Sequence, residues 1–382
     1  MRVAIVTPYP ADDGQIGGGG EAAAEMLVKG FQCLGSGCPD IFIIAPGQDR
    51  TATLENRNGV TIHWLPRLRL PGSMGYWTEQ RIEIQRMLRR INPDITHFQG
   101  LYGWALGWPG PHIVTVHGIP EKDVQYSSNG ALLAGLKATL IGAVERYGRR
   151  RAHSTILISP YVKVELGAHL GGDLYEIENP VADDYFHVKR QPGNLPVALY
   201  VGRVSARKNI LGMIDAFQSV VDYQPAATLR IAGAVDDQEY YAGCIERIAA
   251  NGLTNNVAFL GPVGRDRLVS ELSEAKVLLL LSFQETAPIV IQEAMAAGVP
   301  VVASDVGGVR WSVSNLESGF LVIPTDTFGA AHSISKLIGD DQLAKEMGNA
   351  GRRIAFARFH YQSVARRTLD AYVQVISSPP VI

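Results

Sequence analysis

The sequence predicts an α/β protein with two domains, each built on a parallel sheet. Apolar runs of strand length alternate with stretches of helical composition along most of the 382 residues, and this alternation is the pattern of βα units. It stops at residues 183–196, a polar segment with two prolines, and then restarts. The length suffices for two domains, which we expect at 1–185 and 186–360, followed by a C-terminal helix and tail at 361–382.

Composition excludes several functional classes. Hydrophobic residues make up 46% of the chain, which supports full cores and excludes wholesale disorder. The formal net charge of −2 gives no reason to expect nucleic acid as a partner. The N-terminal apolar run is too short for a signal-peptide core, and no stretch approaches about 20 uninterrupted apolar residues, so we expect no membrane span. Three scattered cysteines favour a reducing compartment, and we expect a soluble, cytoplasmic protein.

In the first domain, two positions at the ends of strands are candidates for binding a ligand. The expected strands are 2–7, 40–45, 60–65, 94–98, 112–117, 154–159 and 174–178. Glycines 17–20 lie between the first strand and a helix expected at 21–34, where they would let backbone N–H groups approach a phosphate closely; a flexible surface loop is the alternative. His117 ends a later strand, where it could hydrogen-bond a polar ligand, move a proton or serve as a structural histidine.

Two expected helices of the first domain are basic. The helix at 76–91 is amphipathic and carries Arg81, Arg86, Arg89 and Arg90. The helical stretch at 131–151 is apolar early and arginine-rich late. Either helix could contact anionic lipid and hold the protein peripherally at the inner membrane face, and an ordinary solvated surface is the alternative.

In the second domain, the loop after the first strand concentrates positive charge. The expected strands are 197–202, 227–233, 256–260, 276–282, 299–304 and 319–323. Arg203 and Lys208 follow the first of them and stand beside the N-terminus of the next helix, where the helix dipole already favours anions. Two such cations can offset the charge of a diphosphate without a metal, although a structural role is the alternative. Arg207 is interpreted as a solvated neighbour.

Residues 275–311 hold two glutamates in the setting of a ligand site. Glu285 follows a buried apolar strand, at the place where open α/β sheets usually put the groups that contact ligands. Thr286 is expected to cap the next helix, Pro288 to lie within its first turn, and Glu293 to come about two turns further along. A pair of solvated surface glutamates is the alternative interpretation.

Together these segments resemble a family. The glycine loop, GRVSARKN at 202–209 and SFQETAPIVIQEAMAAGVPVVASDVGG at 282–308 are similar to the retaining GT-B glycosyltransferases of glycosyltransferase family 4. Glu285 and Glu293 fit the family's Glu-x7-Glu motif. The resemblance implies two Rossmann-like domains facing across a crevice, with the C-terminal helix crossing back to the N-terminal domain.

The resemblance also implies roles for particular residues. Arg203 and Lys208 would hold the diphosphate of a nucleotide-sugar donor, and Glu293 would accept hydrogen bonds from the ribose hydroxyls. Glu285 and His117 would lie by the donor sugar. The backbone of the residues after Glu285 would contact the sugar or phosphate, and the glycine loop would close over the diphosphate or the acceptor. These backbone positions are Thr286, Ala287, Pro288 and Ile289, and, in the glycine loop, Gly18 and Gly19.

The implied activity is transfer of a sugar from a nucleoside-diphosphate sugar to an acceptor hydroxyl, with retention of configuration and without a metal or other cofactor. The acceptor, a glycan, a lipid-linked molecule or a small molecule, is left open. Many relatives have Gly-Phe-Gly where this chain has Thr286-Ala287-Pro288, and proline lacks an N–H donor. The alternatives are a non-catalytic nucleotide-sugar-binding module and a GT-B epimerase or phosphorylase.

Overall fold

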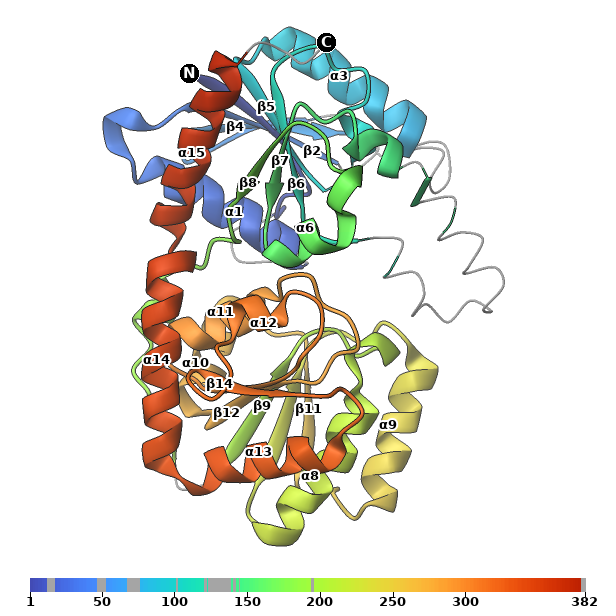
Figure 1. Cartoon of the computed structure of the whole chain (residues 1–382), viewed down its shortest axis with the longest axis vertical. Helices are drawn as coiled ribbons and strands as arrows, with labels where there is room; N and C mark the ends of the chain where they lie inside the picture. Colours follow the sequence, from blue (N-terminus) through green and yellow to red (C-terminus); the bar gives the residue numbers. More distant parts are fainter. Residues whose placement is uncertain are drawn as a thin grey trace. The chain divides into compact units, whose positions relative to one another are not determined.

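The computed structural model describes residues 1–11, 18–46, 53–66, 76–100, 102–119, 122, 139, 142–143, 145–193 and 196–378. These residues form two compact α/β units (Figure 1). The first unit consists of the described residues up to Pro180 together with those from Tyr361 onward, and the second runs from Val181 to His360. Among the helices that the structure describes, none combines the length and hydropathy needed to cross a bilayer.

The described residues of the first unit contain an eight-stranded sheet in the order β3-β4-β2-β1-β5-β6-β7-β8. Its strands are β1 (Arg2–Val6), β2 (Asp40–Pro46), β3 (Thr53–Arg57), β4 (Val60–Leu65), β5 (Ile95–Gln99), β6 (His112–Val116), β7 (Ser154–Leu157) and β8 (Asp173–Glu176). All neighbours are parallel except β3, which pairs antiparallel with β4. β3 was not expected from the sequence, because an edge strand that reads TLENR has no apolar run.

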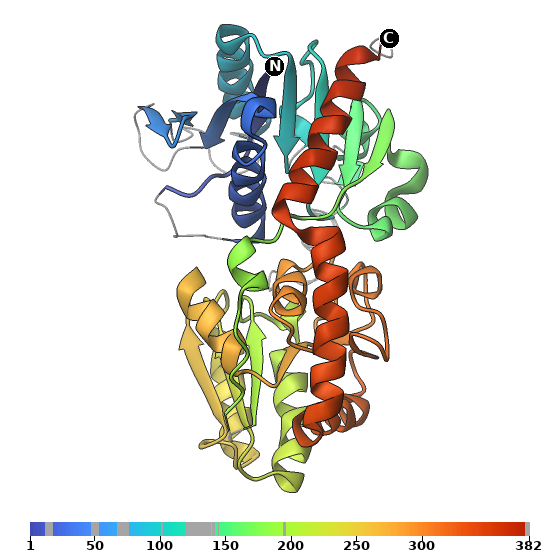
Figure 2. The ribbon, with the colours of Figure 1, turned by 90° about the vertical axis from the view of Figure 1, so that its left-hand side faces the viewer.

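Two helices from opposite ends of the chain pack together over this sheet. They are α1 (Gly19–Gln32) and α15 (Tyr361–Ser377), which lie side by side in Figures 1 and 2. A Cβ on Gly30 of α1 would lie 2.6 Å from Cβ of Ala365, so glycine is what allows this close approach. Apolar side chains of both helices, including Phe31 and Tyr372, form one core with the inner side chains of β1, β2, β5 and β6. The expectation that the C-terminal helix returns to the N-terminal domain is confirmed.

The remaining helices of the first unit are shorter. They are α3 (Arg81–Ile91), which follows a π-helical turn at Tyr76–Gln80, and α6 (Pro160–Leu166). The expected helix at 76–91 is therefore present with an irregular first turn. Of the helix expected at 131–151, the basic end is described and is helical at 145–149, with Arg149 only 1% exposed. Most of the earlier, apolar part lies outside the described residues.

The second unit is a six-stranded parallel sheet in the order β11-β10-β9-β12-β13-β14. Its strands are β9 (Val197–Val201), β10 (Thr228–Ala232), β11 (Val257–Gly261), β12 (Val277–Leu280), β13 (Val301–Ser304) and β14 (Gly319–Val322). Numbered along the chain, this is the 3-2-1-4-5-6 order of the Rossmann fold. The order reverses between β9 and β12, so the loops that leave these two strands lie at the switch point of the sheet, where open α/β sheets usually bind their ligands.

Helices cover the second sheet and its ends. They are α7 (Asp183–Phe186), α8 (Ile210–Tyr223), α9 (Gln238–Ala250), α10 (Arg265–Glu274), α11 (Ile289–Ala296), α12 (Val309–Ser312), α13 (Thr327–Gly339) and α14 (Asp341–Phe359). Among them, α8 packs against α13, and α11 packs against α14 (Figure 1).

The division between the units falls at Pro180 and Val181, earlier than the boundary expected at 185/186. The polar composition of 183–196 suggested a linker, but its beginning is helical and packed. Tyr185 and Phe186 of α7 are only 3% and 5% exposed. In addition, the N–H of Val181 donates to the carbonyl oxygen of Phe359 (2.8 Å), which ties the start of this segment to the end of α14.

Candidate functional site

Lys208 and Glu285 meet at the switch point of the second sheet. Lys208 lies in the loop after β9 and Glu285 in the loop after β12, the two loops between which the strand order reverses. The Lys208 ammonium donates a hydrogen bond to Oε1 of Glu285. Their side chains are 13% and 7% exposed, so most of the charge of this pair is withdrawn from water. A buried carboxylate beside a buried ammonium is costly to maintain, which favours a function for the pair.

The loop after β9 is shaped by glycine and asparagine. Gly202 has φ 152°, a conformation that L side chains rarely adopt, and a Cβ on Gly233 would lie 1.9 Å from the Gly202 carbonyl oxygen. Asn209 adopts a left-handed conformation (φ 54°) and caps α8 by accepting from the N–H of Gly212. Its amide donates to the carbonyl oxygens of Leu281 (3.0 Å) and Pro324 (2.9 Å). Asn209 therefore ties together the loops that follow β9, β12 and β14.

Arg207 belongs to the cluster, contrary to its interpretation as a solvated neighbour. Its guanidinium lies 4.0 Å from Oε2 of Glu285 and donates to the carbonyl oxygen of Gln284 (3.0 Å). Its own carbonyl oxygen accepts from the N–H of Phe283 (2.9 Å). The two loops are thus joined through backbone and side chain, and two cations flank one carboxylate.

Arg203 lies apart from this cluster. Its guanidinium pairs with the carboxylate of Asp236 (2.5 Å), and its side chain is 59% exposed. The structure therefore brings Lys208, but not Arg203, to Glu285. At that exposure the Arg203 side chain is free to exchange Asp236 for another anion at little energetic cost.

The loop that carries Glu285 is fixed by a pair of glycines. The N–H of Gly308 donates to the carbonyl oxygen of Glu285 (3.0 Å). Gly307 has φ 51°, and a Cβ there would lie 1.7 Å from the same oxygen. Only glycine fits at this position, which explains Gly307, the first glycine of the pair that follows β13.

The helix after Glu285 begins later than expected. Thr286 and Ala287 are buried residues of the loop, Pro288 is the N-cap residue, and α11 starts at Ile289. The expectations that Thr286 caps the helix and that Pro288 lies in its first turn are therefore wrong. Because proline at the N-cap has no N–H, the helix offers its first N–H groups from Ile289 onward.

Glu293 lies in the second turn of α11 and has a partner that the sequence did not indicate. The hydroxyl of Tyr185, on α7, hydrogen-bonds its carboxylate, and Arg265 attracts it electrostatically. Burial nevertheless dominates and raises the pKa of Glu293 to about 7. The carboxylate therefore gains its charge near neutral pH, while burial raises the pKa of Tyr185 well above its usual range, so the phenol stays a hydrogen-bond donor.

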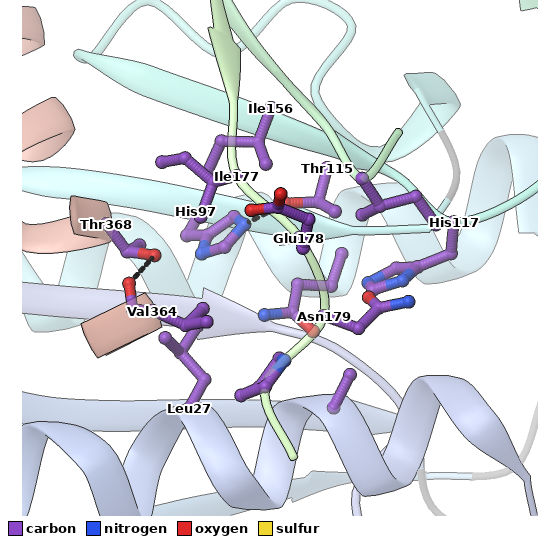
Figure 3. A pocket seen from close by; sticks show the side chains of 14 residues that line it. Leu27, His97, Thr115, His117, Ile156, Ile177, Glu178, Asn179, Val364 and Thr368 are labelled. Atoms are coloured by element: carbon purple, nitrogen blue, oxygen red, sulfur yellow. Dashed lines mark hydrogen bonds between the residues drawn. The ribbon is translucent and has the colours of Figure 1, made fainter. Parts of the chain in front are cut away.

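In the first unit, His117 lies directly after β6 and faces a pocket (Figure 3). Its Nε2 is buried and makes no hydrogen bond to any described residue. Burial lowers the pKa of His117 to about 4, although a hydrogen bond with Asn179 acts in the opposite direction. His117 is therefore neutral at physiological pH and could offer an uncharged hydrogen-bonding group.

The glycine loop of the first unit is described only at its end. Gly18 is the N-cap of α1 and Gly19 its first residue, so the helix begins two residues before the expected start at residue 21. Gly18 is extended (φ 177°), and a Cβ on Gly18 or Gly20 would meet nothing within 4 Å. Nothing in the described structure requires glycine at these two positions, and Gly17 lies outside the described residues.

Metal ligands were not expected from the sequence. Within the ranges that the structure describes, no group of three or more His, Cys, Asp or Glu side chains is arranged to hold a metal ion.

Solved structures share the whole fold. Sucrose-phosphate synthase from Thermosynechococcus elongatus superposes with a TM-score of 0.82 over 99% of this chain and 100% of its own, at 20% identity. The HepE protein of Anabaena, solved with UDP and glucose, gives a TM-score of 0.75 over 98% and 100% of the two chains, at 19% identity. The fold is that of the GT-B glycosyltransferases.

Sequence comparison gives the family. The model described as Glycosyltransferase Family 4 matches residues 17–185, and the model described as Glycosyl transferases group 1 matches residues 181–354. A curated relative, the glycogen synthase of Mycobacterium tuberculosis, is 26% identical over 294 residues, which is 75% of this chain and 70% of the relative. The chain belongs to the family 4 (group 1) glycosyltransferases.

Proposed function

We propose that the protein is a retaining glycosyltransferase that moves a sugar from a nucleoside-diphosphate sugar to an acceptor hydroxyl. The observation that carries this proposal is the Lys208–Glu285 pair at the switch point, flanked by Arg207. Switch points of open α/β sheets are where nucleotides bind. The solved HepE protein holds UDP, and this chain shares its fold.

The cluster is suited to a leaving diphosphate. Lys208 and Arg207 lie in the turn before α8, whose N-terminus favours anions. As the bond between the sugar and the diphosphate breaks, negative charge grows on the phosphate, and fixed cations in a partly dry site stabilise it strongly. The proposal needs no metal for this step, because side-chain cations supply the positive charge. Arg203 joins by exchanging Asp236 for a phosphate oxygen.

Glu285 and His117 lie by the donor sugar and act through positioning and electrostatics, and Glu293 accepts hydrogen bonds from the ribose. Attack by the acceptor hydroxyl on the face that the diphosphate leaves retains the configuration, and the leaving phosphate accepts the acceptor's proton. The backbone of Thr286, Ala287, Pro288 and Ile289 contacts the sugar or the phosphate, and Gly18 and Gly19 contact the diphosphate or the acceptor.

The first test is calorimetric titration with UDP, GDP and ADP, with and without EDTA. We expect micromolar binding of one nucleotide, unaffected by EDTA and lost when the cation is removed in Lys208→Met/Glu285→Gln. The paired substitution is needed because Lys208→Met alone would leave the Glu285 carboxylate buried without its ammonium. Glu285→Gln alone is the matched control and should still bind the nucleotide.

The stereochemical part has its own test. With the matching nucleotide sugar and an accepting alcohol, proton NMR of the first product formed should show the same anomeric configuration as the donor. An inverted product would refute retention while leaving the transferase assignment intact. Binding of a nucleotide without any transfer or donor hydrolysis would favour a non-catalytic binding module.

We also propose a peripheral contact with anionic membrane through α3. Ile82, Arg86 and Arg89 are exposed and lie on one face of this helix, at the i, i+4, i+7 spacing. Co-sedimentation with vesicles of phosphatidylglycerol should be lost in Arg86→Gln/Arg89→Gln, and equal binding by both proteins would refute the contact.

A further inference from the structure

The first unit contains a small, partly open cavity under its two terminal helices, lined by both apolar and polar side chains. It has a volume of about 20 Å³ (Figure 3). Helices α1 and α15 form one side of it, and the carboxyl halves of β5, β6 and β7, together with the segment after β8, form the other. The same face of the sheet is apolar further down, where Ile95 and Ile113 belong to the hydrophobic core. Beginning two residues further along each strand, the same face is polar. It carries His97 and Gln99 on β5, Thr115 on β6, and His117 directly after β6.

A chain of hydrogen bonds reaches this cavity from α15. The hydroxyl of Tyr372 lies 2.6 Å from Nδ1 of His97, and Nε2 of His97 lies 2.6 Å from the hydroxyl of Thr115. Tyr372 and His97 are 0% and 1% exposed, so water does not compete for these bonds. Burial lowers the pKa of His97 to about 3, with His117 contributing, so the ring is neutral and has one N–H.

The direction of the chain follows from its donors. His97 is the only hydrogen-bond partner of the Tyr372 hydroxyl among the described residues, so the phenol hydrogen must point at Nδ1. Nε2 of His97 then carries the hydrogen and donates it to Thr115. The hydroxyl hydrogen of Thr115 is left for an acceptor within the cavity.

Two buried acceptor atoms face the same space. Oε1 of Gln99 and Nε2 of His117 make no hydrogen bond to any described residue. A buried polar atom without a partner is costly, and a cavity of this size holds about one water molecule. A water there accepts from Thr115 and donates to Gln99 and His117, which are the three hydrogen bonds that buried waters typically make.

We propose that this cavity binds one ordered water, and that the water completes a relay from Tyr372 through His97 and Thr115 to His117. Tyr372 and His97 are then positioning residues. Through the water they fix His117 in the tautomer with its hydrogen on Nδ1 and its acceptor on Nε2. The functional consequence rests on the proposed transferase activity, in which His117 lies by the donor sugar.

The test is the tautomer of His117, read by ¹⁵N NMR of histidine-labelled protein without any substrate. Wild type should show Nε2 of His117 as an unprotonated, hydrogen-bonded acceptor. Tyr372→Phe removes the hydroxyl but keeps the ring, and Thr115→Val removes the hydroxyl at the cavity at nearly constant volume. Each should shift the Nε2 resonance of His117 and mix its tautomers, and the double variant should shift it no further.

Thr368→Val is the matched control. Thr368 lines the same cavity, but its hydroxyl donates to the Val364 carbonyl oxygen of its own helix (2.8 Å), outside the relay. Its variant should leave the His117 resonances unchanged. Thr115→Val tests the relay even if Tyr372→Phe does not fold. Unchanged His117 resonances in Thr115→Val would overturn the proposal. So would a high-resolution crystal structure without water density between Gln99 and His117.

The enzymatic consequence is measured separately. Tyr372→Phe should lower kcat for transfer at an unchanged KM for the donor, because His117 is mispositioned rather than removed. If the wild-type protein has no transferase activity, the proposed function fails, while the NMR result still decides the relay.

Discussion

Binding of a nucleotide should be coupled to the ionisation of Glu293. The ribose hydroxyls are donors, and a carboxylate accepts from both, whereas a protonated carboxyl group presents a hydrogen of its own. Because the pKa of Glu293 is raised to about 7 in the free protein, the ionised fraction is about 9% at pH 6 and about 91% at pH 8. An affinity that requires the ionised form scales with this fraction, so Kd should fall about tenfold over the interval.

The assay is calorimetric titration of the nucleotide at pH 6, 7 and 8, with Glu293→Gln as the reference. The phosphate groups of the ligand titrate too, but their effect is common to both proteins and cancels in the ratio of their dissociation constants. Glutamine cannot ionise, so the variant should lack the tenfold term, equal to about 1.4 kcal/mol. Identical pH dependence in both proteins would refute the coupling.

The same raised pKa has a consequence for stability. A carboxyl group whose pKa is higher in the folded chain than its value of 4.5 in the unfolded chain stabilises the folded chain at pH values below 4.5. This stabilisation is lost as the pH rises through about 7, the pKa of Glu293 in the folded chain. Relative to wild type, Glu293→Gln should therefore gain free energy of unfolding between pH 5 and pH 8. Urea denaturation at the two pH values measures it, and a constant difference would contradict the shifted pKa.

Three further substitutions test the packing of the site and of the first unit. Lys208→Met should lower the free energy of unfolding by up to about 3–5 kcal/mol, because it leaves the buried carboxylate of Glu285 with Arg207, 4.0 Å away, as its remaining cation. Adding Glu285→Gln should restore stability but not activity. Gly307→Ala should lower the free energy of unfolding by more than about 1 kcal/mol and should lower activity, because a Cβ there meets the Glu285 carbonyl oxygen. The control is Gly264→Ala, where a Cβ meets nothing within 4 Å. Gly30→Val should destabilise the first unit by separating α1 from α15, seen as a lower urea midpoint.

Much of the second unit could be predicted from local pattern. Its strands are short apolar runs, and Lys208 and Glu285 come in the loops that leave two of them, so both could be placed at the same edge of the sheet from the amino-acid sequence alone. The start of α11 could not, because Thr286 and Pro288 are each acceptable at several positions near a helix N-terminus. The role of Arg207 depends on a loop distant in the sequence, and nothing in its neighbours reveals it.

Contacts between distant segments account for the rest. Tyr185 lies in a stretch whose polar composition suggests a linker, yet it is buried against α11 and bonds Glu293. His97 and Tyr372 are 275 positions apart, so no periodicity in the sequence connects them. Residue type identified His117 and Glu293 as candidates, but their protonation depends on burial, which only the folded chain determines.

The return of α15 to the first unit has a consequence for biosynthesis. In chain order, the second unit is an insertion between β8 and the helix that completes the core of the first. During synthesis, the segment Val181–His360 is therefore complete before α15, with Tyr372 and its apolar neighbours, is available to the first unit. Until then, part of the apolar surface around Phe31 is uncovered and is a site for chaperone binding or aggregation. Truncation before Tyr361 should accordingly damage the first unit far more than the second.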